Sequence, residues 1–219
     1  MYILALDTTG TSGSLALQRE DVLLEEVLLS APGGFSTTLY SGIADLLGRH
    51  NVALSSIDCF AAASGPGSFT GVRIGLAAVK SMAEALGKNA TGVSTLEALA
   101  WYGSADLRAS VLDARRGEVY AAVFRGNLEV VSPEVVVPFQ FWVSTLPLEE
   151  VGEFIGLDLQ PFRNSLPASA LMTERGTLAS GVAAIARTRL LRNESGDPVT
   201  IEANYVKRCD AEVLWQQAN

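Results

Sequence analysis

The spacing of hydrophobic residues alternates along the chain between a strand-like and a helix-like period, in an order that occurs twice. In the first half, three β-prone apolar segments precede a loop and a segment with apolar residues at helical spacing. A buried strand, a long apolar helix, a short strand and a helix begun by a capping box follow. The expected elements are Tyr2–Leu6, Ser14–Leu17, Val22–Leu29, the loop Ala31–Ser36, Thr38–Arg49, Ile57–Ala63, Phe69–Leu86, Thr91–Val93 and the helix from Ser94.

A similar order restarts at Arg108. Its expected elements are strands at Ala109–Leu112, Glu118–Phe124 and Val130–Val137, a helix at Phe139–Thr145, a strand at Glu153–Gly156 and a helix at Leu178–Arg192. Two β-β-β-α-β-α halves predict an α/β fold duplicated as in the actin, sugar-kinase and Hsp70 ATPases, with ribonuclease H-like halves. We expect residues 1–104 to form an N-terminal lobe that carries the helix 69–86, and residues 105–219 a second, smaller lobe.

The stretch SGPGSFTGVRIGL, residues 64–76, joins a buried strand to a helix that is apolar on nearly every side. Its glycines and proline permit a sharp strand-to-helix corner, and Ser68 stands where an N-cap belongs. Gly71 and Gly75, with Ala78 a turn later, leave a groove that either an element of the same chain or another subunit could fill. The turn lacks the GxxxxGK[ST] phosphate-loop spacing, because Val72 stands five residues after Gly67.

The polar turn after the first expected strand begins with Asp7, Thr8 and Thr9. In a duplicated ATPase-like fold this turn approaches a nucleotide phosphate, because hydroxyls and backbone N–H groups can form an anion nest. These three residues are therefore the candidates for binding ATP or ADP with Mg. The alternative is ordinary turn chemistry. We expect the isolated chain to require no cofactor.

The composition limits the location and the partners. Hydrophobic residues make up 48% of the 219, and the mean hydropathy is +0.26, yet no apolar run has the length of a membrane span. The start of the chain has no basic flank and has the pattern of a strand, so we expect a cytoplasmic protein without membrane contact. The net charge of −8 would repel phosphate backbones on average, which disfavours direct binding of nucleic acid.

The few histidines and cysteines exclude several chemistries. His50 is the only histidine and stands at an expected helix end, where solvation or capping is its ordinary role. One histidine cannot supply a zinc site, and Ser68 lacks the spacing of a nucleophile elbow. Cys59 and Cys209 do not indicate a disulfide framework. We therefore expect no metal site and no catalytic residue.

A second polar cluster surrounds the expected turn at Arg115 and Arg116. The hairpin would aim both guanidinium groups outward, while Glu118 and Tyr120 alternate with apolar Val119. Arg115 and Glu118 are candidates for contact with a phosphate or a partner carboxylate. The structural alternative is that Asp113 and Arg115 only fix the turn.

Four segments, ILALDTT, GPGSFTGVRIGL, GVSTLEALA and DARRGEVYAAVF, resemble in this order the TsaB family, also called YeaZ. They lie between Ile3 and Phe124, and Glu202–Arg208 is similar to the closing segment of that family, which we expect beside the N-terminal sheet. Phe35-Ser36 stands where members of the family often have His-Ser, so any role of that histidine has no counterpart here.

The resemblance implies a non-catalytic subunit in making threonylcarbamoyladenosine on tRNA. Such chains associate through the glycine-containing helix, as a homodimer alone or as a heterodimer with the catalytic subunit TsaD, and the ATPase TsaE joins the assembly. The chain would then meet tRNA only through the complex. The implied interface residues are Gly71, Val72, Ile74, Gly75 and Ala78, with Arg73 either making polar contacts at the edge or covering the helix with its stem.

Two functional hypotheses from different classes follow. The first is a cytoplasmic, non-enzymatic dimerisation subunit that supports a TsaD-like subunit. The second is an independent ATP-dependent kinase or nucleotide hydrolase of the same fold. A direct tRNA-binding module is a third, less favoured because of the acidic balance.

Overall fold

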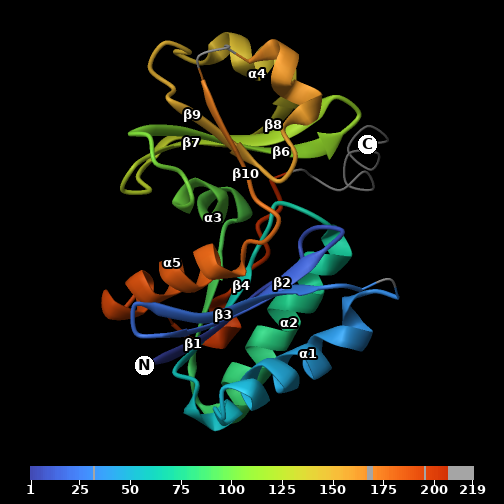
Figure 1. The fold of residues 1–219 in the computed structure, drawn as a ribbon, viewed down its shortest axis with the longest axis vertical. Helices are drawn as coiled ribbons and strands as arrows, with labels where there is room; N and C mark the ends of the chain where they lie inside the picture. Colours follow the sequence, from blue (N-terminus) through green and yellow to red (C-terminus); the bar gives the residue numbers. More distant parts are fainter. Residues whose placement is uncertain (32, 167–169, 195, 207–219) are drawn as a thin grey trace, which may run out of the picture.

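Two five-stranded sheets with the same internal order form the protein, which was analysed as a computed structural model (Figure 1). The structure describes residues 1–206 except 32, 167–169 and 195. The first sheet has the order β3-β2-β1-β4-β5, and the second has the order β8-β7-β6-β9-β10 when taken from its other edge. This repeat confirms the predicted duplicated α/β fold.

The strands and helices follow the predicted sequence of elements closely. The first sheet contains β1 Tyr2–Asp7, β2 Gly13–Arg19, β3 Val22–Leu29, β4 Cys59–Ala63 and β5 Asn89–Val93. The second contains β6 Leu107–Arg115, β7 Glu118–Arg125, β8 Val130–Pro138, β9 Glu153–Gly156 and β10 Leu171–Glu174. The helices are α1 Phe35–Arg49, α2 Phe69–Leu86, α3 Thr95–Trp101, α4 Phe139–Thr145 and α5 Ala179–Leu191, with 3-10 turns η1 Leu54–Ser56, η2 Gln160–Ser165 and η3 Pro198–Thr200.

Strand β1 is the centre of the first sheet. It runs antiparallel to β2 and parallel to β4, so that Ala5 lies opposite both Ala16 and Ala61. Helices α1 and α2 cover one face of this sheet and α5 covers the other (Figure 1). A strand covered on both faces must be apolar on both, which explains its continuous apolar run.

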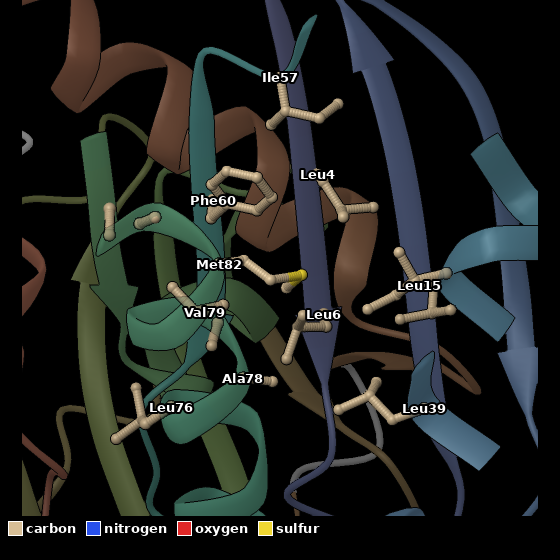
Figure 2. Close-up of a cluster of buried hydrophobic side chains, with 14 of the residues drawn as sticks. Leu4, Leu6, Leu15, Leu39, Ile57, Phe60, Leu76, Ala78, Val79 and Met82 are labelled. Atoms are coloured by element: carbon tan, nitrogen blue, oxygen red, sulfur yellow. The ribbon is translucent and has the colours of Figure 1, made fainter. Parts of the chain in front are cut away.

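The larger core lies between the first sheet and helices α1 and α2. Leu4 and Leu6 of β1 meet Leu39 of α1 and Val79 of α2 in one cluster (Figure 2). Full burial of a leucine or phenylalanine side chain contributes about 1.5–3 kcal/mol. Ala78 also lies in this cluster (Figure 2), so part of the predicted interface face of α2 is core.

The two halves exchange a helix. Helix α3 belongs to the first half in sequence, but its Leu96 and Leu99 pack with Phe124 and Ile155 of the second sheet. Helix α5 belongs to the second half, but its Val182 packs with residues of the first sheet. The division into lobes 1–104 and 105–219 stays a prediction as a boundary, and this exchange shows that each stretch sends one helix to the other sheet.

Two local expectations were wrong. Helix α1 begins at Phe35 and not at Thr38, because the Phe35 ring is buried against the core and close to Gly13. The predicted loop is therefore shorter. Strand β10, which pairs with β9, was not predicted, since its four residues are too few to show a period.

None of the helices in the described part of the chain combines the length and the apolarity needed to cross a bilayer.

Candidate functional site on helix α2 and the Asp7 turn

Helix α2 has the bounds and caps that its sequence predicts. The Ser68 side chain accepts a hydrogen bond from the Gly71 N–H at 3.3 Å, as an N-cap does. At the other end Gly87 adopts a left-handed conformation with φ 61°, and its N–H bonds to the carbonyls of Ala83 and Glu84. The helix therefore starts and stops where Ser68 and Gly87 place its ends.

The groove at Gly71 and Gly75 is filled by the chain itself. A Cβ atom on Gly71 would overlap the carbonyl oxygen of Thr8, and one on Gly75 would lie 2.6 Å from the Thr8 hydroxyl oxygen. The same hydroxyl donates a hydrogen bond to the Gly71 carbonyl at 2.7 Å. The groove could have been filled by an element of the same chain or by another subunit. The structure shows that an element of the same chain fills it.

This packing corrects most of the predicted interface. Gly71, Val72, Gly75 and Ala78 are buried within the chain, so their atoms are not offered to another subunit. Arg73 is exposed and Ile74 is partly exposed, and their role as interface residues stays a prediction. The expectation was wrong for the buried residues because small residues permit close approach equally well from inside the chain.

The outer face of α2 carries an aromatic and cationic stack. The Phe69 and Tyr205 rings are stacked with centroids 5.4 Å apart, and the Arg73 guanidinium carbon lies 3.8 Å from the Phe69 centroid. Arg73 Nε donates to the Tyr205 hydroxyl at 2.9 Å. Phe69 and Tyr205 stay 48% and 47% exposed. Arg73 therefore holds an ordered position above the surface and does not simply cover the helix with its stem.

Residues 198–206, which include the described part of Glu202–Arg208 and are called the closing segment below, lie beside α2. The Asn204 N–H donates to the Ser64 carbonyl at 2.7 Å, and Lys80 Nζ donates to the Val199 carbonyl at 3.2 Å. Between helix and segment lies a groove of about 550 Å³, lined by Arg73, Leu76, Ala77, Lys80, Ile201, Glu202, Ala203 and Tyr205. Lys207 and Arg208 of the predicted segment lie outside the described residues.

Comparison of the chain with known proteins identifies its family. A Bacillus subtilis protein, "tRNA threonylcarbamoyladenosine biosynthesis protein TsaB", is 30% identical over 98% of this chain and 98% of its own length. The chain belongs to the TsaB family. An Escherichia coli TsaB is 34% identical over 57% of this chain and 55% of its own length. A family model described as "TsaD: tRNA N6-adenosine threonylcarbamoyltransferase" matches residues 31–147.

Solved structures agree with the fold. A Pseudomonas aeruginosa crystal structure, described as similar to peptidase YEAZ, has a TM-score of 0.82 at 27% identity and covers 94% of this chain and 99% of that one. An activator of 2-hydroxyisocaproyl-CoA dehydratase from Clostridium difficile, with bound ADPNP, has a TM-score of 0.53 at 8% identity and covers 89% and 97%. The second likeness shows the ATPase-like fold alone.

In this TsaB-family chain the Asp7 turn is closed by its own hydrogen bonds. Asp7 Oδ1 accepts from the Thr9 N–H at 2.8 Å and from the Thr9 hydroxyl at 2.7 Å. The Thr9 carbonyl accepts from the Ser68 N–H at 2.7 Å, so the glycine turn packs directly on this loop. Asp7, Thr8 and Thr9 are all buried. Their role as a nucleotide site stays a prediction, and the structure shows the turn chemistry that was its alternative.

Replacement of Asp7 by asparagine is expected to stabilise the protein at neutral pH. Burial raises the pKa of Asp7 above its usual 3.8, although hydrogen bonds from Thr9 act in the opposite direction. Because the folded-state pKa is raised, the carboxyl stabilises the fold below pH 3.8 and loses that contribution as the pH rises through the folded-state pKa. Asparagine keeps an acceptor for Thr9 without the buried charge. Thermal unfolding from pH 3 to 8 should show the advantage of Asp7→Asn growing with pH. A difference between variant and parent that does not change with pH would contradict this, and Asp106→Asn, an exposed change elsewhere in the chain, is the control.

Residue Glu134 was missed by the sequence analysis. It lies on β8 in the second sheet, but its carboxylate accepts hydrogen bonds from the Ser94 hydroxyl and, at 2.6 Å, from Asn204 Nδ2. Asn204 Nδ2 also donates to the Gly65 carbonyl at 3.3 Å. Glu134 thus ties the second sheet to the closing segment and to the cap of α3. No local pattern marks it, because its partners are 40 and 70 residues away.

Removal of the Asn204 side chain is expected to loosen the closing segment. Asn204→Ala deletes both amide donors and leaves Glu134 with fewer partners, which should cost about 1–3 kcal/mol. Amide hydrogen exchange over residues 198–206 should accelerate, and the melting temperature should fall. Glu202→Ala, an exposed change in the same segment, is the control. Unchanged exchange in the Asn204 variant would show that this side chain does not hold the segment.

The Arg115 turn is fixed by its backbone. Asp113 Oδ1 accepts from the Arg115 N–H at 2.7 Å, and Arg115, Arg116 and Gly117 have φ of 69°, 57° and 80°. The structural alternative is therefore correct for Asp113, although it acts on the main chain of Arg115 and not on its guanidinium. Both arginine side chains are exposed and Glu118 is half-buried. Contact of Arg115 and Glu118 with a partner stays a prediction.

His50 and Cys59, for which no catalytic role was predicted, lie in different elements. His50 caps the end of α1, and its ring bonds to Glu25 at 2.8 Å beside the Arg49–Glu25 ion pair. Cys59 is buried in β4, while Cys209 lies outside the described residues. Across the portion of the chain that is described, no three His, Cys, Asp or Glu residues gather as a metal site would require.

Proposed function

We propose that this chain acts in the biosynthesis of threonylcarbamoyladenosine on tRNA as a non-catalytic subunit, and that it binds a TsaD-like catalytic subunit through the outer face of α2. The names of its relatives support the pathway. The exposed stack of Phe69, Arg73 and Tyr205 is the observation that carries the binding role. A TsaE-like ATPase would join the assembly, and tRNA would be met through the complex.

The stack has the properties of an interaction hot spot. Tyrosine and arginine dominate such spots, and side chains already fixed in place lose less conformational entropy on binding. Arg73 uses Nε for Tyr205, which leaves its two terminal nitrogens to face a partner carboxylate. A partner with an acidic group between apolar side chains would fit this surface.

The charges along α2 support a homodimer when the chain is alone. Arg73 lies toward the N-terminal end of the exposed face and Glu84 toward the C-terminal end, with small Ala77 and Ser81 between them. Two such helices packed antiparallel would bring each Arg73 near the other chain's Glu84, while the small residues permit close approach. The face is therefore complementary to itself.

The hydrogen bonds of the Asp7 turn support a non-enzymatic role. The atoms that would face a phosphate are already bonded to Thr9, Gly71 and Ser68 of the same chain. Binding of Mg-ATP would have to break these contacts. We therefore expect neither tight binding nor turnover of Mg-ATP by the purified chain, in contrast to a kinase or nucleotide hydrolase.

Reconstitution tests the proposal. A cognate TsaD-like subunit, a TsaE-like subunit and tRNA are supplied with the threonylcarbamoyl donor, and transfer to tRNA is followed with and without this chain. We expect transfer to depend on the chain, and calorimetry of the chain alone with Mg-ATP to show no tight binding. Equal transfer without the chain, or Mg-ATP turnover by the chain alone, would overturn the proposed role.

A further inference from the structure

A second hollow lies where α3, α5 and the β2–β3 hairpin meet, away from the outer face of α2. It has a volume of about 300 Å³, at the lower end of the range for small-molecule pockets. Its lining comes from both halves of the chain: Gln18, Asp21, Leu23, Glu26, Trp101, Tyr102, Arg175, Ser180 and Ala184. We refer to it as the Trp101 pocket.

The Trp101 pocket contains a cation with unused donors. The Arg175 guanidinium carbon lies 4.0 Å from the centre of the Tyr102 ring. Its Nε is buried and has no hydrogen-bond partner. Among the residues whose positions are described, Arg175 forms no side-chain hydrogen bond and no ion pair. A buried donor left unpaired costs about 1–3 kcal/mol, which a ligand carboxylate would relieve.

The floor of the pocket is held rigid by a directional chain of hydrogen bonds. Ser180 donates from its N–H and its hydroxyl to the two Glu26 carboxylate oxygens, each at 2.9 Å. The Tyr102 hydroxyl is 2.8 Å from Ser180 Oγ and accepts from the Gly181 N–H at 3.0 Å. Because Ser180 Oγ donates to Glu26, Tyr102 is the donor to Ser180. Burial raises the pKa of Tyr102, which keeps that proton in place at neutral pH.

Acceptors for a cation line the same space. Asp21 is exposed at the rim and has no hydrogen bond or ion pair within the described ranges, and the Glu26 carboxylate, which accepts from Ser180, lies beside the floor. Gln18 uses Nε2 to donate to the Glu20 carbonyl at 2.8 Å, which leaves its amide oxygen available. The pocket thus offers three acceptor groups, the number that a primary ammonium can use, and one guanidinium for a carboxylate.

We propose that the Trp101 pocket binds a free α-amino acid as its zwitterion. Arg175 holds the carboxylate, and Asp21, Glu26 and the Gln18 oxygen hold the ammonium. Trp101, which is 41% exposed and packed edge-on to Tyr102 at 4.9 Å, covers the ligand side chain together with Leu23. The opposed charges reject ligands that carry only one of the two groups, since such a ligand leaves the other group unpaired.

Indole resonances provide a direct test on the full-length chain. The Trp101 indole N–H signal of ¹⁵N-labelled protein is assigned with Trp101→Phe, and each common protein amino acid is titrated separately to about 10 mM. We expect saturable shifts for at least one amino acid with a Kd of about 1 mM or lower. If leucine binds, 4-methylpentanoate and 3-methylbutylamine, which lack its ammonium and carboxylate respectively, should each bind at least about tenfold more weakly.

Two variants test whether Arg175 and Asp21 bind the charged groups of the ligand. Arg175→Gln and Asp21→Asn should each weaken binding at least about tenfold. Asp21→Asn is the decisive variant if Arg175→Gln unfolds, because Asp21 is exposed and makes no structural contact within the described residues. Arg192→Gln and Asp106→Asn, both exposed outside the pocket, are the matched controls. The proposal is overturned if no amino acid shifts the Trp101 signal, if a single-charge analogue binds as tightly, or if Asp21→Asn keeps full affinity.

Discussion

Replacement of Gly71 by valine is expected to prevent stable folding, and not only to block association. A Cβ atom at this position would overlap the backbone carbonyl of Thr8, which belongs to the turn after the central strand β1 and cannot move without breaking the Asp7 turn. The smaller change Gly71→Ala should already cost about 2–4 kcal/mol, or roughly 10 °C in melting temperature. Thermal unfolding followed by circular dichroism measures the loss.

The matched control for Gly71 lies on the opposite side of the same helix. Ala77→Val adds similar bulk at an exposed position, and its cost should be limited to a helix-propensity difference of well under about 1 kcal/mol. Ala77 itself lies on the face proposed for dimerisation, so it is a control for folding only, and sedimentation of Gly71→Val beside its melting curve separates folding from association. A Gly71→Val protein that melts like the parent but sediments as a smaller species would return Gly71 to the interface and contradict the packing described for Thr8.

Truncation of Arg73 is expected to have the largest effect on partner binding. Arg73→Ala should weaken association with a TsaD-like subunit by about 30-fold or more, the effect of losing roughly 2 kcal/mol at a hot spot. The melting temperature should stay nearly constant, because the guanidinium rests on exposed Phe69 and Tyr205 and not on the core. Isothermal calorimetry with the purified partner measures the change.

The variant Tyr205→Phe measures how much the hydrogen bond between Arg73 and Tyr205 contributes to partner binding. It removes only the hydroxyl that accepts from Arg73 Nε and keeps the ring beside Phe69, so the affinity should fall by a few-fold only. Arg192→Ala, which removes an exposed arginine from the end of α5, is the control for net charge. If Arg73→Ala binds the partner as tightly as the parent, the outer face of α2 is not the binding surface.

The position of the candidate site on α2 could be predicted from the sequence, but the face of the helix that is exposed could not. The spacing of Gly71 and Gly75 predicts a close approach of another backbone, and the structure contains one. Spacing does not say which backbone approaches, because a helix with apolar residues on nearly every side gives no polar face from which to tell the inside from the outside. The interface prediction therefore included Val72 and Ala78, which belong to the core.

Contacts between residues far apart in the sequence could not be predicted from local sequence patterns. Glu134 meets Ser94 and Asn204, and Arg175 lies over Tyr102, only because segments far apart in the chain pack together. Neither Glu134 nor Arg175 belongs to a motif. Their side chains are ordinary in composition, and contacts with residues far away in the sequence give them a role.

The duplicated order of strands and helices, and the position of α2 between Ser68 and Gly87, could be predicted from the residues alone, because periodicity and capping depend on residues close together in the chain. The occupant of the glycine groove, the sheets that α3 and α5 cover, and the exposed side of α2 became known only from the folded chain. Those outcomes depend on packing between segments far apart in sequence. The SGPGSFTGVRIGL stretch therefore has two sides: its glycines hold the chain's own Asp7 turn, and its Phe69 and Arg73 form the outer stack with Tyr205.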